Sequence, residues 1–255
     1  MATSQIACTL YTLREYTRTP ATIAKTLEKV KQIGYSAVQF SALGPIEAPE
    51  LAKILKEEGL TCCASHVSIE QLRTDTQKVI DDHKLWGCPH VAIGGLLPRN
   101  PVTQTWLDFA EEFNTFAKKF EGSGIKLGYH THSNDYARFD GKQAMQILLE
   151  HFRPDIWIEL DVYWIAAAGA DPAQHITQLK GRVPCIHMKD MNVRPDRTAL
   201  FAEVGEGNLN WPAIITAGKG AGVEWYIVEQ DNAYGKSPFD CIETSLKHLR
   251  EFGLT

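Results

Sequence analysis

"ATIAKTLEKVKQIGYSAVQFSAL", residues 21–43, combines one helix-like pattern with one strand-like run. Ile23, Leu27 and Val30 repeat at about one helical turn, and Gly34 stands where a helix commonly ends. The run from residue 37 to residue 43 that follows is short and mostly apolar, as a buried strand is. The stretch therefore predicts a helix that leads directly into a strand.

The same alternation extends over the whole chain. Strand-like runs cover residues 6–13, 37–43, 61–67, 90–96, 125–131, 157–164, 183–190 and 225–231. Segments with helical spacing lie between them, and no linker or low-complexity tract divides the 255 residues. Strands that alternate with helices pair in parallel, and eight such units in about 250 residues are typical of a closed (β/α)8 barrel. We therefore predict an α/β fold with a single TIM barrel domain over residues 1–255.

The composition favours a small-molecule partner over a nucleic acid or a membrane. The net charge is −5, and no block of Lys or Arg is present, so the chain has no long-range attraction for polyanions. No stretch approaches the ~18 consecutive apolar residues of a membrane span. We therefore expect neither nucleic acid nor membrane as a partner.

The expected compartment is the cytoplasm. The first 13 residues contain no cationic segment followed by a long apolar core, which a secretory signal would require. The six cysteines form no CxxC pair and no regular framework, so we expect reduced thiols.

Polar side chains gather where the expected strands end. Side chains along a strand alternate between the two faces, so residues two apart point to the same side. With His187 facing the barrel interior, the inward set comprises Gln39, Ser41, His66, His130, His132, Asp161, His187, Lys189, Glu229 and Asp231. In TIM barrels the carboxyl ends of the strands hold the active site, so this set predicts a polar site at one mouth of the barrel.

Asp161, His187 and Glu229 each follow apolar residues at the end of an expected strand. A single buried acid is as consistent with a satisfied core group as with a ligand. Several such groups at neighbouring strand ends are costly to bury together unless a cation neutralises them. Oxygen ligands with one imidazole favour Mn²⁺, Mg²⁺ or Co²⁺, and Zn²⁺ is also compatible. We predict a divalent metal cofactor, with Mn²⁺ as the first choice.

Five blocks of the sequence resemble a known family. They are "GYHTHSNDY" (128–136), "ELDVYWIAAAGADP" (159–172), "IHMKDM" (186–191), "EVGEGNLNW" (203–211) and "YIVEQD" (226–231). Together they look like the xylose isomerase-like TIM barrels. That superfamily holds sugar phosphate isomerases and epimerases, ketohexose 3-epimerases, inosose dehydratases and, more distantly, endonuclease IV.

The resemblance implies one divalent cation held by Asp135, Asp161, His187 and Glu229. Asp135 stands where many relatives carry Glu, and its shorter side chain must bring the backbone nearer the ion or bind through water. His130 and His132 therefore remain alternatives for the fourth ligand, and both are also candidate substrate contacts.

Further site residues are expected around the metal. The inward position of His66 favours contact with a substrate hydroxyl over a core role, and Lys189 is a candidate for oxyanion stabilisation or proton exchange. Glu206 lies in a Gly-flanked loop, where a substrate contact and a solvated acid are equally compatible. Trp164 and Tyr11 could give a sugar ring an apolar floor or could simply pack.

We expect a metal-dependent isomerase or epimerase that acts on a keto sugar or polyol through a metal-stabilised enediolate. Glu229 and Asp135 would serve as acid and base. The alternative is a metal-dependent dehydratase or lyase, either inosose dehydratase-like or acting by elimination from a 3-keto-glycoside. A non-catalytic sugar-binding barrel is the alternative of another class, and the negative charge argues against an endonuclease IV-like phosphodiesterase. The expected partner is a small carbohydrate, and a homo-oligomer is possible because barrels of this type often associate.

Overall fold

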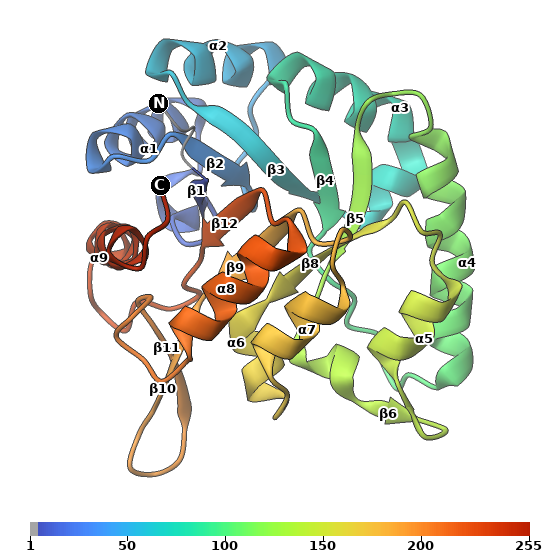
Figure 1. Ribbon diagram of the computed structural model, residues 1–255. Coiled ribbons are helices and arrows are strands. Elements are labelled where there is room, and N and C mark those ends of the chain that lie inside the picture. Colours follow the sequence, from blue (N-terminus) through green and yellow to red (C-terminus); the bar gives the residue numbers. More distant parts are fainter. Residues whose placement is uncertain (1–4) are drawn as a thin grey trace.

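The computed structural model describes residues 5–255, in which eight parallel strands form a closed barrel (Figure 1). The strands are β1 (Ile6–Thr9), β2 (Ala37–Phe40), β3 (Thr61–Val67), β4 (His90–Ile93), β5 (Lys126–His130), β8 (Trp157–Asp161), β9 (Cys185–Met188) and β12 (Trp225–Val228). Each falls within one of the eight predicted runs, so the single-domain TIM barrel fold is confirmed. The first 13 residues were expected to contain no secretory signal, and residues 1–4 of them lie outside the part of the chain that the structure describes.

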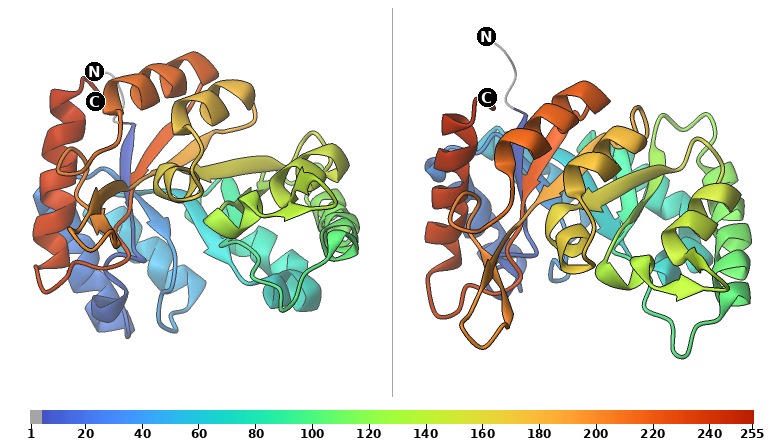
Figure 2. Two further views of the ribbon diagram at one scale, coloured as in Figure 1. Left: turned by 90° about the horizontal axis from the view of Figure 1, so that it is seen from below. Right: turned by 60° about the horizontal axis from the view of Figure 1, so that its bottom comes forward.

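Helices surround the barrel in the order that the sequence predicts (Figure 2). They are α1 (Pro20–Ile33), α2 (Ala48–Glu58), α3 (Ile69–Trp86), α4 (Thr103–Lys119), α5 (Ala144–His151), α6 (Val162–Ala167), α7 (Pro172–Gln178), α8 (Trp211–Ala221) and α9 (Pro238–Glu251). Short 3₁₀ helices η1 (Arg14–Tyr16) and η2 (Ser133–Tyr136) follow β1 and β5, and two small hairpins pair β6 (Arg138–Phe139) with β7 (Lys142–Gln143) and β10 (Asp190–Val193) with β11 (Ala199–Ala202).

Local sequence signals fix the ends of the first helix. Thr19 caps α1 by accepting a hydrogen bond from the Thr22 backbone N–H, and Pro20 occupies the first turn, where its missing N–H costs nothing. Gly34 ends the helix with φ of 113°, a conformation that side chains with a Cβ rarely adopt. The helix therefore stops where the glycine predicted, and β2 begins three residues later.

Seven of the eight strands are shorter than the predicted runs, and only β3 keeps its predicted bounds. β1 ends at Thr9 because the chain turns and enters η1, and β8 ends at Asp161 because Asp161 caps α6 through its side chain. Trp164 therefore lies on a helix rather than at a strand end.

Small apolar side chains and one indole fill the lower part of the barrel interior. This cluster contains Ala7, Ala37, Cys63, Ala64, Ala92, Trp157, Cys185 and Ile227. Gly128 on the neighbouring strand makes room for the indole, because a Cβ there would lie 2.3 Å from Trp157 Cε2. Trp157 thus closes the interior below the polar strand ends.

The larger hydrophobic core lies between the barrel and its helices and includes Ile186 and Met188, which alternate with the inward-facing His187 along β9. Beyond the carboxyl ends of the strands, the β10–β11 hairpin and the connection between β4 and α4 extend on the same side of the barrel (Figure 2). The six cysteines are all buried and free, and within residues 5–255 no helix is long and apolar enough to cross a membrane.

Candidate active site

Two overlapping groups of potential ligands lie at the carboxyl ends of the barrel strands. The outer cluster comprises His130, Asp161, His187 and Glu229, and the inner cluster comprises His66, His130, Glu159 and His187. In each cluster the ligand atoms lie within 4.8 Å of one another. Neighbouring strands bring them together, since Asp161 of β8 is the register partner of His187 of β9.

The outer cluster is held in place by the backbone around Asp161. One oxygen of Asp161, Oδ1, accepts hydrogen bonds from the N–H groups of Tyr163 (2.9 Å) and Trp164 (3.2 Å) at the start of α6. The other oxygen, Oδ2, lies 3.8 Å from His187 Nδ1, and Glu229 Oε2 lies 3.0 Å from the same nitrogen. His187 Nδ1 therefore faces two carboxylates.

The outer cluster fits a divalent cation. Asp161 Oδ2 is buried and makes no hydrogen bond of acceptable geometry, although Lys189 Nζ is 2.9 Å away, so it retains a free acceptor position. Burial, together with the nearby His187, holds the pKa of His130 well below its usual value, which keeps that imidazole in the neutral form that ligates metals. Two carboxylates and two imidazoles suit Mn²⁺, Co²⁺ or Zn²⁺.

Lys189 places a positive charge among three acids. Its Nζ lies 2.9 Å from Asp161 Oδ2, 2.5 Å from Glu229 Oε2 and 2.8 Å from Asp231 Oδ1. Burial lowers the pKa of Lys189, but these carboxylates raise it more, so the side chain remains an ammonium. The pKa of Asp231 is also raised, to about 6, because burial and the charge of Glu229 outweigh the charge of Lys189.

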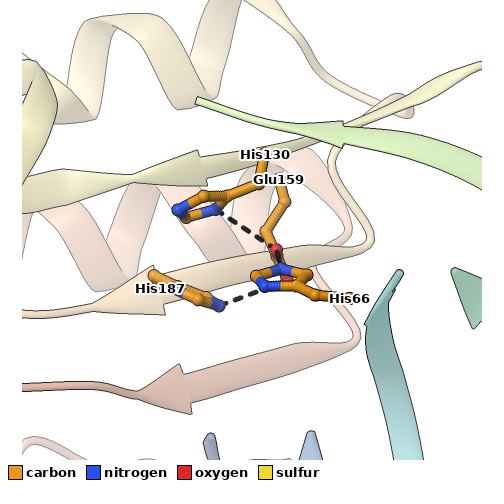
Figure 3. A group of neighbouring side chains, drawn as sticks. All are labelled: His66, His130, Glu159 and His187. Carbon is orange, nitrogen blue, oxygen red and sulfur yellow. Dashed lines mark hydrogen bonds and ion pairs between the residues drawn. The ribbon is translucent and has the colours of Figure 1, made fainter. Parts of the chain in front are cut away.

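Glu159 is the centre of the inner cluster, and the sequence reasoning missed it. Its carboxylate is fully buried and lies 2.5 Å from His66 Nε2, 3.2 Å from His130 Nδ1 and 3.4 Å from His187 Nε2 (Figure 3). The signal was available, because Glu159 is two residues before Asp161 in the same strand and therefore points to the same side.

The charges of the inner cluster are balanced. Burial raises the pKa of Glu159, but the charges of His187 and His66 lower it by a larger amount. The net result is a pKa well below the usual value. Burial likewise lowers the pKa of His187, whereas Glu159 and Glu229 together raise it well above 6.5. In the absence of a cation, a protonated His187 thus sits between two carboxylates.

A cavity of about 680 Å³ opens over the clusters. Its lining includes six of the predicted site residues, namely Tyr11, His66, His130, His132, Lys189 and Glu229. Asp231 also lines it, whereas Asp161 and His187 are fully buried beside it. Apolar residues of the segment after β2, such as Leu43 and Ile46, form another part of the wall.

Asp135 does not join the outer cluster. It lies in η2, where it accepts hydrogen bonds from the His132 N–H (2.7 Å) and the Tyr129 hydroxyl (2.8 Å). Its side chain is fully buried away from the cavity, and burial raises its pKa to about 7. The Asp135 carboxylate thus forms hydrogen bonds within its own loop. His130, which was one of two alternatives for the fourth ligand, lies with Asp161, His187 and Glu229 instead.

Two other predicted residues lie at the edge of the site or outside it. Trp164 is not part of the cavity wall, but its ring lies 5.5 Å from that of His132 and 5.3 Å from Lys189 Nζ, so it packs behind both. Glu206 is outside the cavity, 3.6 Å from His248 Nε2, and its side chain is 54% exposed. Its loop is tied down by Asp190, which accepts hydrogen bonds from the Gly205 and Gly207 N–H groups.

Comparison with known proteins identifies the family of the barrel. Residues 27–252 match the family model described as "Xylose isomerase-like TIM barrel". The chain belongs to the xylose isomerase-like TIM barrel family. It is 24% identical over 208 residues to a 2-oxo-tetronate isomerase of Pectobacterium atrosepticum, a match that covers 71% of this chain and 76% of the relative.

Solved structures share the fold over nearly the whole chain. A sugar phosphate isomerase/epimerase from Parabacteroides distasonis superposes with a TM-score of 0.82 at 22% identity, covering 98% of this chain and 94% of the other. An L-ribulose 3-epimerase superposes with a TM-score of 0.76 at 16% identity, with the same coverage of both chains. At such identities the likeness concerns the fold.

Proposed function

We propose that this protein is a divalent-metal-dependent isomerase of a small keto sugar or keto sugar acid. The observation that carries the proposal is the outer cluster at the base of a cavity, with the Lys189 ammonium beside it. Membership of the xylose isomerase-like family and the similarity to a 2-oxo-tetronate isomerase support the substrate class.

His130, Asp161, His187 and Glu229 would hold the cation, since their side chains come from four neighbouring strands and offer two carboxylates and two imidazoles. A bound divalent cation supplies Lewis acidity, which polarises a substrate carbonyl and lowers the pKa of the adjacent C–H.

Glu229 is the residue that we assign to proton transfer. Its carboxylate lines the cavity, and the charges of Lys189 and His187 outweigh burial and hold its pKa well below the usual value, so it is ionised and can accept a proton. Lys189 then places a positive charge where the substrate oxygen becomes negative. His66 and His132, which line the same cavity, would bind substrate hydroxyls, His66 through Nδ1, which contacts the Ser41 hydroxyl when no substrate is bound.

With Asp135 outside the cavity, the proposed chemistry relies on Glu229 as the carboxylate that moves the proton. A single group can carry a proton between two adjacent carbons on one face of the substrate, which is isomerisation. Epimerisation requires delivery from the opposite face by a second group. We therefore place isomerisation before epimerisation.

Proton exchange in D₂O tests this proposal directly. Protein loaded with Mn²⁺ or Co²⁺ is incubated with a 2-oxo-tetronate and with a panel of ketopentoses, and the reactions are followed by ¹H NMR. Deuterium incorporation next to the carbonyl together with interconversion of isomers is expected, and Glu229→Gln should abolish both. Release of water with an unsaturated product would favour the dehydratase or lyase alternative. Saturable binding with no exchange for any substrate would favour a non-catalytic sugar-binding barrel.

A further inference from the structure

We infer that Glu159 is a positioning residue that, through Gln39, sets which ring nitrogen of His187 is free to ligate the cation. The inference rests on the proposed function, because it assumes that the outer cluster binds a divalent cation. It assigns a role to Glu159 and Gln39, neither of which is a ligand in the outer cluster.

The argument begins with the carboxylate of Glu159, which can only accept hydrogen bonds when ionised. Gln39 Nε2 lies 2.6 Å from Glu159 Oε1. An amide nitrogen donates and an amide oxygen accepts, so this short contact fixes which end of the Gln39 amide faces Glu159. Both side chains are fully buried, and solvent cannot offer the amide another arrangement.

The orientation of the amide then determines the tautomer of His187. The oxygen of Gln39, Oε1, points away from Glu159 and lies 2.7 Å from His187 Nε2. An oxygen that only accepts requires a hydrogen on Nε2. Neutral His187 therefore carries its lone pair on Nδ1, the nitrogen that faces Asp161 and Glu229.

The second oxygen of Glu159 faces two more imidazoles: it is hydrogen-bonded to His66 and lies close to His130, whose Nδ1 makes no hydrogen bond of acceptable geometry. Oε2 lies 2.5 Å from His66 Nε2 and 3.2 Å from His130 Nδ1 (Figure 3). The other nitrogen of His66, Nδ1, lies 3.2 Å from the Ser41 hydroxyl. With Nδ1 of His130 turned to Glu159, Nε2 of that ring is left for the outer cluster. A carboxylate behind a ligating imidazole is a common way to fix its orientation and increase its basicity.

The inner cluster is better explained as a set of contacts that orient the imidazoles of the outer cluster than as a second cation site. The Gln39 amide lies between Glu159 and His187 and bonds to both, so the space is already used. One cation per chain is therefore the expected stoichiometry.

Glu159→Gln tests the inference without changing side-chain size. A glutamine at position 159 can present N–H to Gln39, which allows the Gln39 amide to turn and select the other tautomer of His187. We expect the affinity for Co²⁺, measured by calorimetry on protein stripped of metal, to fall roughly 10–100-fold. The visible spectrum of bound Co²⁺ should change as well, because it reports on the ligating nitrogens. Glu203→Gln is the matched control, since Glu203 is another buried acid with an ion pair of its own, to Lys236.

Histidine tautomers give a readout that does not depend on affinity. In Zn²⁺-loaded protein with ¹⁵N-labelled histidine, long-range ¹H–¹⁵N correlations should show His187 with hydrogen on Nε2 and metal on Nδ1. If Glu159→Gln does not fold, Gln39→Met can be used instead. It removes the amide that connects Glu159 to His187, leaves Glu159 intact and should weaken Co²⁺ binding to a similar extent. The double variant should lose little more than either single one, because the two residues act in one chain.

The outcomes separate this inference from the proposed function. Wild-type protein that binds no Co²⁺ overturns both. Tight Co²⁺ binding by the wild type, with unchanged affinity and spectrum in Glu159→Gln, overturns the inference alone, as does a His187 that ligates through Nε2. Binding of two Co²⁺ per chain would place a cation in the inner cluster and would also overturn it.

Discussion

Replacing Asp135 with asparagine should make the protein less sensitive to pH without harming its activity. The Asp135 side chain is fully buried, and burial raises its pKa to about 7 from an unfolded value of 3.8. A carboxyl whose pKa is higher in the folded state binds its proton more tightly there. The stability it contributes is therefore present at low pH and is lost as the pH rises from about 4 to about 7.

The size of this effect follows from the shift. Each pKa unit corresponds to 1.36 kcal/mol, so a change of about 3 units gives roughly 4 kcal/mol across the whole range. Between pH 5 and pH 8 the wild type should lose about 3 kcal/mol through Asp135 alone. Asparagine does not titrate, so Asp135→Asn should lack this loss. The variant should be more stable than the wild type at pH 8. Weaker hydrogen bonds to the His132 N–H and the Tyr129 hydroxyl should reduce this gain in the free energy of unfolding by about 1 kcal/mol.

Urea unfolding at pH 5 and pH 8 measures the effect. The informative quantity is the difference between the two proteins in their change of unfolding free energy with pH, because other titrating groups cancel in it. Tyr129→Phe is the companion variant. It removes a donor to Asp135 and should raise the pKa of Asp135 further, which moves the loss of stability to higher pH. An equal pH dependence in wild type and Asp135→Asn would refute the reasoning. Loss of Co²⁺ binding in Asp135→Asn would instead return Asp135 to the metal site.

Three further predictions concern the site and the barrel. His187→Ala and Glu229→Gln should lower kcat/KM by roughly 10²–10³-fold or more while leaving the circular dichroism spectrum unchanged, because each removes a member of the outer cluster; turnover near the wild-type rate in either would contradict the assignment. His66→Ala should raise KM about tenfold, the loss of one good hydrogen bond, and change Co²⁺ affinity less, as calorimetry can show; unchanged kinetics would make His66 structural. Gly128→Ala should lower the free energy of unfolding by about 3 kcal/mol in urea, because the new Cβ would meet the Trp157 ring; a neutral result would mean that the ring moves without cost.

The barrel and the inward set of side chains could be predicted because both depend on local periodicity. Helix-ending glycines such as Gly34 and the twofold alternation along strands are properties of consecutive residues, and the structure follows them. The same alternation would have found Glu159 from Asp161. The prediction used only the last polar residue of each strand, and Glu159 lies one inward position deeper, where its carboxylate contacts the imidazoles.

The position of Asp135 could not be obtained in this way. It follows the end of β5, where side-chain direction depends on how the chain turns, and the turn into η2 points the carboxylate at Tyr129 instead of the cavity. The distance of Glu206 from the site has a similar origin, since the path of its loop is set by the backbone bonds to Asp190, which are remote in sequence. Contacts of this kind depend on tertiary structure and leave no periodic trace.

The plug formed by Trp157 and the small residues around it gives the cavity a blind end. A molecule bound next to Glu229 and Lys189 must enter and leave through the same opening. A product therefore has to diffuse out before a new substrate molecule can diffuse in. For a reversible interconversion of similar molecules, each side of the reaction then obstructs the other. For the proposed isomerisation, we therefore expect product to inhibit competitively in both directions.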